Sequence, residues 1–121
     1  MRTRILALAI CVACMAAWSA GALENILFVF DASNSMNKPM GEITRLQAAT
    51  DALSQLLTGL PDETRVGLVV FGHRESRHDE SASCQDIELM YSVDALTPSR
   101  RTEMMASIRG IQAQGMTPLA D

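Results

Sequence analysis

The chain has 121 residues, of which 48% are apolar and 4% aromatic, and its formal net charge at pH 7 is −4. This length allows one domain at most. The acidic balance argues against nucleic acid and against an anionic membrane surface as partners, because both require a basic footprint on the protein.

The first 22 residues have the pattern of a secretory signal peptide. Arg2 and Arg4 form a positive start, residues 5–18 form an apolar run, and residues 20–22 read Ala-Gly-Ala, a small-x-small cleavage pattern. The run is shorter than the ~20 residues that span a bilayer. We therefore expect cleavage after residue 22 and a secreted or periplasmic protein with no other membrane contact. Retention of the segment as an anchor is the alternative.

A continuous apolar run at residues 26–30 (Ile-Leu-Phe-Val-Phe) stops at Asp31. Such a run predicts a strand buried on both faces, and therefore an α/β fold with a parallel sheet between helices. Ligands of these sheets bind at the carboxyl ends of the strands, where Asp31, Ser33 and Ser35 provide three oxygen side chains. Hard oxygen ligands favour Mg²⁺, with Ca²⁺ or Mn²⁺ as alternatives. Capping of the loop or of the next helix by Asp31 and Ser33 explains the spacing equally well.

The period of the apolar residues changes after a breaker-rich loop at residues 32–41. From residue 42 to residue 60 apolar side chains recur every three or four positions, which predicts an amphipathic helix packed on the sheet. Residues 65–71 predict a second strand. Strand, helix and strand together form a βαβ unit, which is right-handed almost without exception.

The remaining elements are a polar loop, a third strand and a second helix. Residues 72–85 contain His73 and His78 among charged neighbours. The two histidines, with the nearby carboxylates, are potential ligands of a transition metal. The composition favours a solvated loop instead, with His73 helping to seat it. Apolar and polar residues alternate at 86–93, which predicts an edge strand with one face covered. Antiparallel pairing with its neighbour is one of the two arrangements that stay open. Residues 98–112 predict a helix.

The sequence Asp31-x-Ser33-x-Ser35 after a buried strand resembles the metal-ion-dependent adhesion site of von Willebrand factor type A (VWA) domains. Residues 115–120 (Gly-Met-Thr-Pro-Leu-Ala) resemble the second metal loop of that family, in which a threonine, here Thr117, precedes a helix. The resemblance implies that the two serine hydroxyls touch the cation directly and that Asp31 acts mainly through water. Thr117 would join directly or through water.

Two further segments, residues 71–74 (Phe-Gly-His-Arg) and 84–89 (Cys-Gln-Asp-Ile-Glu-Leu), resemble a bacterial secreted branch of the family. The resemblance implies a Rossmann-like, doubly wound, mostly parallel sheet with flanking helices. We interpret residues 23–121 as the N-terminal part of such a domain, without the C-terminal part that carries a second acidic metal residue. Cys84 would then be half of a disulfide whose partner is not encoded here; a free, partly buried thiol is the alternative.

The function that the resemblance implies is binding, and we expect no enzymatic activity. The cation would offer an open coordination position to an exposed Asp or Glu of a protein partner, whose identity the sequence does not give. Two alternatives stay open. One is a truncated remnant without a complete metal site. The other is a secreted hydrolase that uses Ser33 or Ser35, although the chain has no G-x-S-x-G nucleophile elbow.

Overall fold

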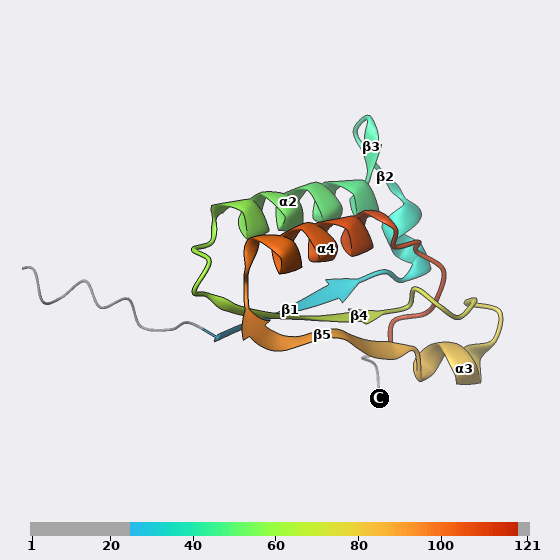
Figure 1. Ribbon diagram of the computed structural model, residues 1–121. Helices are drawn as coiled ribbons and strands as arrows, with labels where there is room; N and C mark the ends of the chain where they lie inside the picture. Colours follow the sequence, from blue (N-terminus) through green and yellow to red (C-terminus); the bar gives the residue numbers. More distant parts are fainter. Residues whose placement is uncertain (1–24, 119–121) are drawn as a thin grey trace, which may run out of the picture.

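The structure is a computed structural model that describes residues 25–118. Its main sheet has three strands in the order β1 (Asn25–Asp31), β4 (Arg65–Phe71) and β5 (Ile87–Ala95) (Figure 1). β1 pairs with β4 in parallel, and β4 pairs with β5 in antiparallel register. The predicted α/β class and the antiparallel edge strand are confirmed. The predicted signal peptide and residues 119–121 lie outside the described part of the chain.

Two long helices cover one face of this sheet. α2 (Arg45–Gly59) and α4 (Pro98–Arg109) lie side by side above the strands (Figure 1). Threonine side chains cap both helices: Thr44 accepts a hydrogen bond from the amide of Gln47, and Thr97 accepts one from the amide of Arg100. The core between helices and sheet consists of fully buried apolar side chains, among them Leu57, Leu68, Leu96, Met104 and Ile108.

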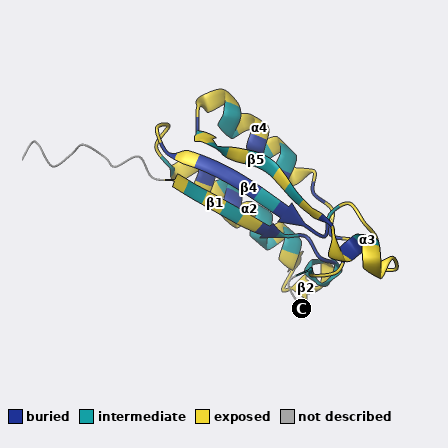
Figure 2. Cartoon of the chain, turned by 90° about the horizontal axis from the view of Figure 1, so that it is seen from below, coloured by how far each residue is buried: buried dark blue, intermediate teal, exposed yellow. Residues whose placement is uncertain are grey.

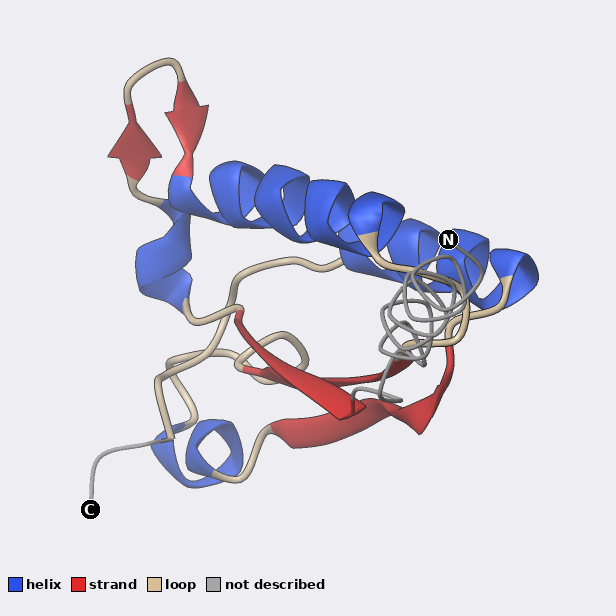
Figure 3. Ribbon diagram, turned by 90° about the vertical axis from the view of Figure 1, so that its left-hand side faces the viewer, coloured by secondary structure: helices blue, strands red, loops and turns tan. Residues whose placement is uncertain are grey.

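The helix predicted from residue 42 begins three residues later, because the chain first forms a hairpin. β2 (Pro39–Met40) pairs with β3 (Ile43–Thr44), and this hairpin stands out from the body of the molecule (Figure 3). Only Gly41 and Glu42 lie between the paired residues. Gly41 has a φ of +69°, and a glycine at the first position of a two-residue turn allows tight hairpin closure.

Three shorter differences concern the loops. The loop at residues 32–41, which the sequence predicts to bind metal, contains a 3-10 helix, η2 (Asn34–Asn37). The loop predicted at residues 72–85 ends in a short helix, α3 (Glu80–Cys84), whose first turn is capped by the Asp79 side chain. Helix α4 ends at Arg109, before the expected end at residue 112. Elements of four or five residues are too short to show a helical period in the sequence.

The opposite face of the sheet carries exposed apolar side chains. Leu27, Val29, Ile87 and Leu89 are each at least half exposed, with values of 50%, 61%, 52% and 59%. Figure 2 shows this face, with β4 mostly buried and exposed positions along β1 and β5. The expectation that the first strand is buried on both faces is therefore wrong for the described residues. Both long helices pack on the same side, so alternate residues of β1 face away from the core.

Candidate functional site

Three loops meet where β1 and β4 end. The loop after β1 begins at Ala32, whose amide donates to the carbonyl of Phe71 at the end of β4 (2.9 Å). The second loop starts at Gly72, directly after β4, and the third follows α4 and runs through Gly115 to Pro118 (Figure 1). This is the carboxyl edge at which the sequence predicted ligand binding.

The predicted ligands Asp31, Ser33 and Ser35 lie together in the first loop. Asp31 Oδ1 accepts a hydrogen bond from the amide of Ser33 at 2.8 Å, and the two serine hydroxyl oxygens are 3.1 Å apart. Ser33 is the residue before η2, but its side chain makes no capping bond there. The loop-capping interpretation is therefore correct for Asp31. For Ser33 the hydroxyl turns toward Ser35 instead.

The separation of these hydroxyls fits a small cation. Neighbouring oxygens on an octahedral Mg²⁺, each 2.0–2.1 Å from the ion, lie about 2.9 Å apart, and the larger Ca²⁺ requires a wider spacing. The observed distance between the Ser33 and Ser35 oxygens is 3.1 Å. A carboxylate and two hydroxyls form a hard-oxygen set of the kind that Mg²⁺ and Mn²⁺ accept. Asp31, Ser33 and Ser35 therefore fit the small divalent cation that the sequence predicts.

The second predicted metal loop lies against the first. Ser33 and Gly115 form an isolated parallel bridge, and the amide of Asn34 donates to the Gly115 carbonyl at 2.7 Å. The Asn37 side chain adds a hydrogen bond of 2.7 Å to the Ala113 carbonyl. Thr117, two residues beyond the bridge, is exposed and makes no hydrogen bond to another described residue. The structure thus joins the two loops, but it does not bring the Thr117 hydroxyl into contact with the serines.

Two glycines allow the loops to approach this closely. Gly72 has a φ of +75°, and a Cβ there would lie 3.0 Å from both the Cα and the amide nitrogen of Ser33. At Gly115 a Cβ would lie 2.8 Å from Ser83 Oγ and 2.9 Å from the Cα of Gly72. Any larger residue at either position would separate the loops.

A buried charge cluster beside the loops was not predicted. The carboxylate of Asp86 is fully buried and accepts hydrogen bonds from the Arg74 side chain (2.7 Å) and from the amides of Arg74 (2.7 Å) and Glu75 (3.0 Å). Next to it, His73 Nε2 lies 2.8 Å from Glu88 Oε2, and His73 Nδ1 lies 4.0 Å from Asp86 Oδ1. The sequence signal for this cluster is the pair of motifs at residues 71–74 and 84–89.

The cluster keeps Asp86 ionised. Burial alone raises the pKa of this carboxyl, but the hydrogen bonds from the Arg74 side chain and from the amides of Glu75 and Arg74 outweigh burial, with help from the nearby His73. The net result is a pKa below the ordinary aspartate value. The same side-chain hydrogen bond raises the pKa of the Arg74 guanidinium.

The described residues give no support to a transition-metal site at His73 and His78. Within residues 25–118 no group of three or more His, Cys, Asp or Glu side chains could hold a metal ion. His78 is exposed, whereas the side chain of His73 is only 10% exposed and is bound to Glu88. Cys84 of α3 is free and exposed, so the alternative of a partly buried thiol is wrong in its burial. The disulfide pairing of Cys84 stays a prediction.

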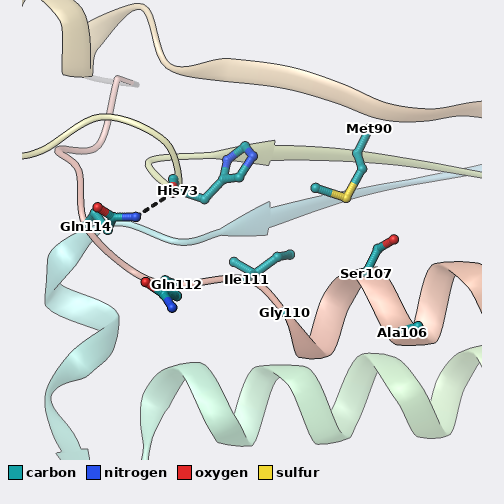
Figure 4. A pocket seen from close by; sticks show the side chains of 8 residues that line it. All are labelled: His73, Met90, Ala106, Ser107, Gly110, Ile111, Gln112 and Gln114. Atoms are coloured by element: carbon teal, nitrogen blue, oxygen red, sulfur yellow. Dashed lines mark hydrogen bonds between the residues drawn. The ribbon is translucent and has the colours of Figure 1, made fainter.

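A shallow pocket lies between β5 and the end of α4. Its volume is about 430 Å³, and it is lined by His73, Met90, Ala106, Ser107, Gly110, Ile111, Gln112 and Gln114 (Figure 4). The Ser107 hydroxyl is hydrogen-bonded to the Tyr91 hydroxyl at 2.8 Å, and the His73 ring is bound to Glu88. This serine and histidine are therefore engaged with other partners, so their geometry does not support a nucleophile–base pair.

Between residues 25 and 118, none of the helices is both long enough and apolar enough to cross a bilayer.

Comparison with known proteins agrees with the geometry. Residues 26–121 match the family described as von Willebrand factor type A domain. The chain is also similar to the uncharacterized protein YwmC of Bacillus subtilis (strain 168), with 29% identity over 101 residues. That alignment covers 84% of this chain but 44% of the relative, so the chain spans less than half of the relative's length. The match to the family covers most of the sequence, including both loops of the site, and the chain belongs to the von Willebrand factor type A domain family.

Proposed function

We propose that this chain is a protein-binding module in which the loop after β1 holds a divalent cation, Mg²⁺ before Ca²⁺ or Mn²⁺. The observation that carries the proposal is the convergence of the Ser33 and Ser35 hydroxyls, 3.1 Å apart, beside Asp31. Membership of a family whose domains are generally protein-interaction modules supports binding over catalysis.

The chemistry of the site favours an acidic partner. Two neutral hydroxyls and one carboxylate leave half of the formal charge of a divalent cation uncompensated. An Asp or Glu side chain of a partner protein supplies the missing negative charge and a further oxygen ligand. Cation and partner then bind cooperatively, because each increases the affinity for the other by the same factor.

The residues of this chain have separate tasks in such a site. Ser33 and Ser35 supply the direct oxygen ligands. Asp31 shapes the loop through its hydrogen bond to the Ser33 amide and adds negative charge nearby. Thr117 contributes its hydroxyl to the cation directly or through water. The signal-peptide pattern of residues 1–22 supports a location for this binding outside the cytoplasm, in the periplasm or the medium.

Metal binding by the whole chain tests the proposal. Titration calorimetry with Mg²⁺, Mn²⁺ and Ca²⁺ should give saturable binding of one ion, and Ser35→Ala should weaken it about tenfold or more because a direct ligand is lost. Ser92→Ala, at an exposed serine of β5, is the matched control and should leave affinity unchanged. If the wild-type chain binds none of these ions at millimolar concentration, it is a remnant without a working site, and the proposal is wrong.

A further inference from the structure

The two motifs that the metal loop does not use meet around Asp86. Residues 71–74 end β4 and turn away from the sheet, and residues 84–89 lead into β5. The Asp86 carboxylate accepts three hydrogen bonds from Arg74 and Glu75, and the Asp86 carbonyl accepts one from the amide of Gly72 at 3.0 Å. Asp86 therefore holds the whole turn from Gly72 to Glu75.

The turn at residues 72–75 supports the second predicted metal loop, which begins at Gly115. The Gly72 carbonyl accepts hydrogen bonds from the amides of Gly115 (2.8 Å) and Gln114 (3.1 Å). The His73 carbonyl accepts another from the Gln114 side chain at 2.9 Å (Figure 4). A backbone carbonyl of the turn accepts each of these three hydrogen bonds. Their geometry therefore depends on how the turn is fixed.

The segment around Asp86 also holds the loop from its other side. Ser83 is fully buried, and its hydroxyl oxygen accepts a hydrogen bond from the amide of Met116 at 2.5 Å. The Ser83 carbonyl accepts from the amide of Asp86. Residues 115–116 are thus clamped between the Gly72 turn and Ser83, and the clamped Gly115 carbonyl receives the amide of Asn34 in the first metal loop.

We propose that Asp86 is a positioning residue of the metal site. It fixes the turn on which Gly115 rests, and through Gly115 it sets how the loop carrying Thr117 lies against Ser33 and Ser35. This inference rests on the proposed function. It adds a residue that makes no hydrogen bond to Ser33, Ser35 or Thr117 among the described residues. A carboxylate is required because its two oxygens accept all three donors, whereas an asparagine has one acceptor oxygen and would turn its amide group toward a donor.

The experiment compares three variants of the full chain. Asp86→Asn removes the charge and one acceptor at nearly constant shape. Asp51→Asn changes an exposed aspartate of α2 and is the matched charge control. Leu57→Ala, in the fully buried core between α2 and the sheet, lowers stability without touching the loops. Two readouts are used well below each Tm: the Kd for Mg²⁺ alone, and amide hydrogen exchange measured residue by residue.

We expect Asp86→Asn to raise the Kd for Mg²⁺ about tenfold or more and to accelerate exchange at the amides of Gly115 and Met116 about tenfold. Asp51→Asn should change neither quantity. Leu57→Ala should lower Tm while leaving the Kd close to that of the wild type. If Leu57→Ala and Asp86→Asn raise the Kd equally at equal loss of Tm, Asp86 is only a stabilising residue and the inference is overturned.

The exchange measurement separates this inference from the proposed function. If the wild-type chain binds no Mg²⁺, the proposed function fails, whereas unchanged exchange at Gly115 and Met116 in Asp86→Asn overturns the positioning role independently. Should Asp86→Asn fail to fold, Arg74→Gln takes its place, because the Arg74 side chain is 48% exposed and supplies only one of the donors to the carboxylate. It should change both readouts in the same direction by a smaller factor, and unchanged values overturn the inference.

Discussion

At Gly72 the chain leaves β4 with a φ of +75°, a conformation that residues with a Cβ rarely adopt. The position that a Cβ would take lies 3.0 Å from two backbone atoms of Ser33, which cannot rotate away as a side chain could. Gly72 also provides the carbonyl on which Gly115 rests. One glycine therefore joins the two loops that are predicted to bind metal, both by its conformation and by its lack of a side chain.

We expect Gly72→Ala to destabilise the chain by at least about 1–2 kcal/mol, because of the cost of a left-handed backbone for a residue with a Cβ. The displacement of Ser33 adds to this cost. Gly59→Ala is the matched control: it lies at the end of α2 with no atom within 4 Å of its future Cβ, so it should be neutral or stabilising by up to about 1 kcal/mol. Urea unfolding of both variants checks the prediction, and equal midpoints would contradict it.

The positions of the residues in the loop after β1 could be predicted from the sequence because their signal is local. Asp31, Ser33 and Ser35 follow a strand at alternate positions, and the strand predicts where they lie. Asp86 could not be predicted in the same way. Its hydrogen-bond donors come from a turn 11 and 12 residues earlier, and nothing in a single sequence shows that a carboxylate at the start of a strand is buried and compensated.

At the scale of elements, one arginine connects the two helices of the covering layer. Arg101 of α4 donates from its guanidinium to the carbonyls of Leu57 and Leu60 (the latter at 2.9 Å) at the end of α2, and to the Asp62 carboxylate at 2.6 Å. The last carbonyls of a helix have no partner within the helix, so a planar group with several donors suits this position.

Replacing Arg101 by methionine should destabilise the chain by about 1–3 kcal/mol, because helix carbonyls in a partly buried place lose their donors. Arg101→Lys, which keeps the charge but not the fork, should fall between methionine and the wild type. The control is Arg45→Met at the exposed start of α2, where a change within about 0.5 kcal/mol is expected. Thermal and urea unfolding measure all three, and similar losses for both methionine variants would show that Arg101 has no special role.

Helix α2 and strand β5 were predictable because their apolar residues recur with a period, and β1 and β4 because their apolar runs are continuous. The ends of the elements were not predictable. Helix α2 begins at Arg45 instead of residue 42, since a two-residue turn at Gly41 uses the preceding residues for a hairpin. The apolar run of β1 shows a related limit. A strand with apolar residues at every position can face helices on both sides or on one side, and the sequence of the strand alone does not distinguish the two arrangements.

At the scale of the whole molecule, the described part has one covered and one uncovered sheet face. Val29, Val69 and Leu89 are paired across β1, β4 and β5 by the strand register, so they form a continuous apolar row on the uncovered face. β1 and β5 are both edge strands of the described sheet. The fold class followed from the alternation of strands and helices in the sequence, but this exposed face depends on which side each helix packs, which only the structure shows.

An exposed apolar face beside open strand edges favours association in water. We expect a protein of residues 23–121 to form dimers or larger species as its concentration rises. Leu89→Lys should shift this equilibrium toward the monomer by placing a charge at the β5 end of the apolar row. Leu56→Lys provides the control, because Leu56 is 55% exposed, close to the 59% of Leu89, but lies on α2 away from this face.

Sedimentation velocity across a hundredfold concentration range measures the effect. The association should weaken at least about tenfold in Leu89→Lys, because a lysine ammonium is costly to bury in an apolar contact, and it should be unchanged in Leu56→Lys. Both variants should keep the wild-type Tm within a few degrees, since neither side chain is in the core. Equal behaviour of the two lysine variants would show that any association depends on overall charge rather than on the uncovered face. A wild-type protein that is monomeric at all concentrations would show that this face does not mediate self-association.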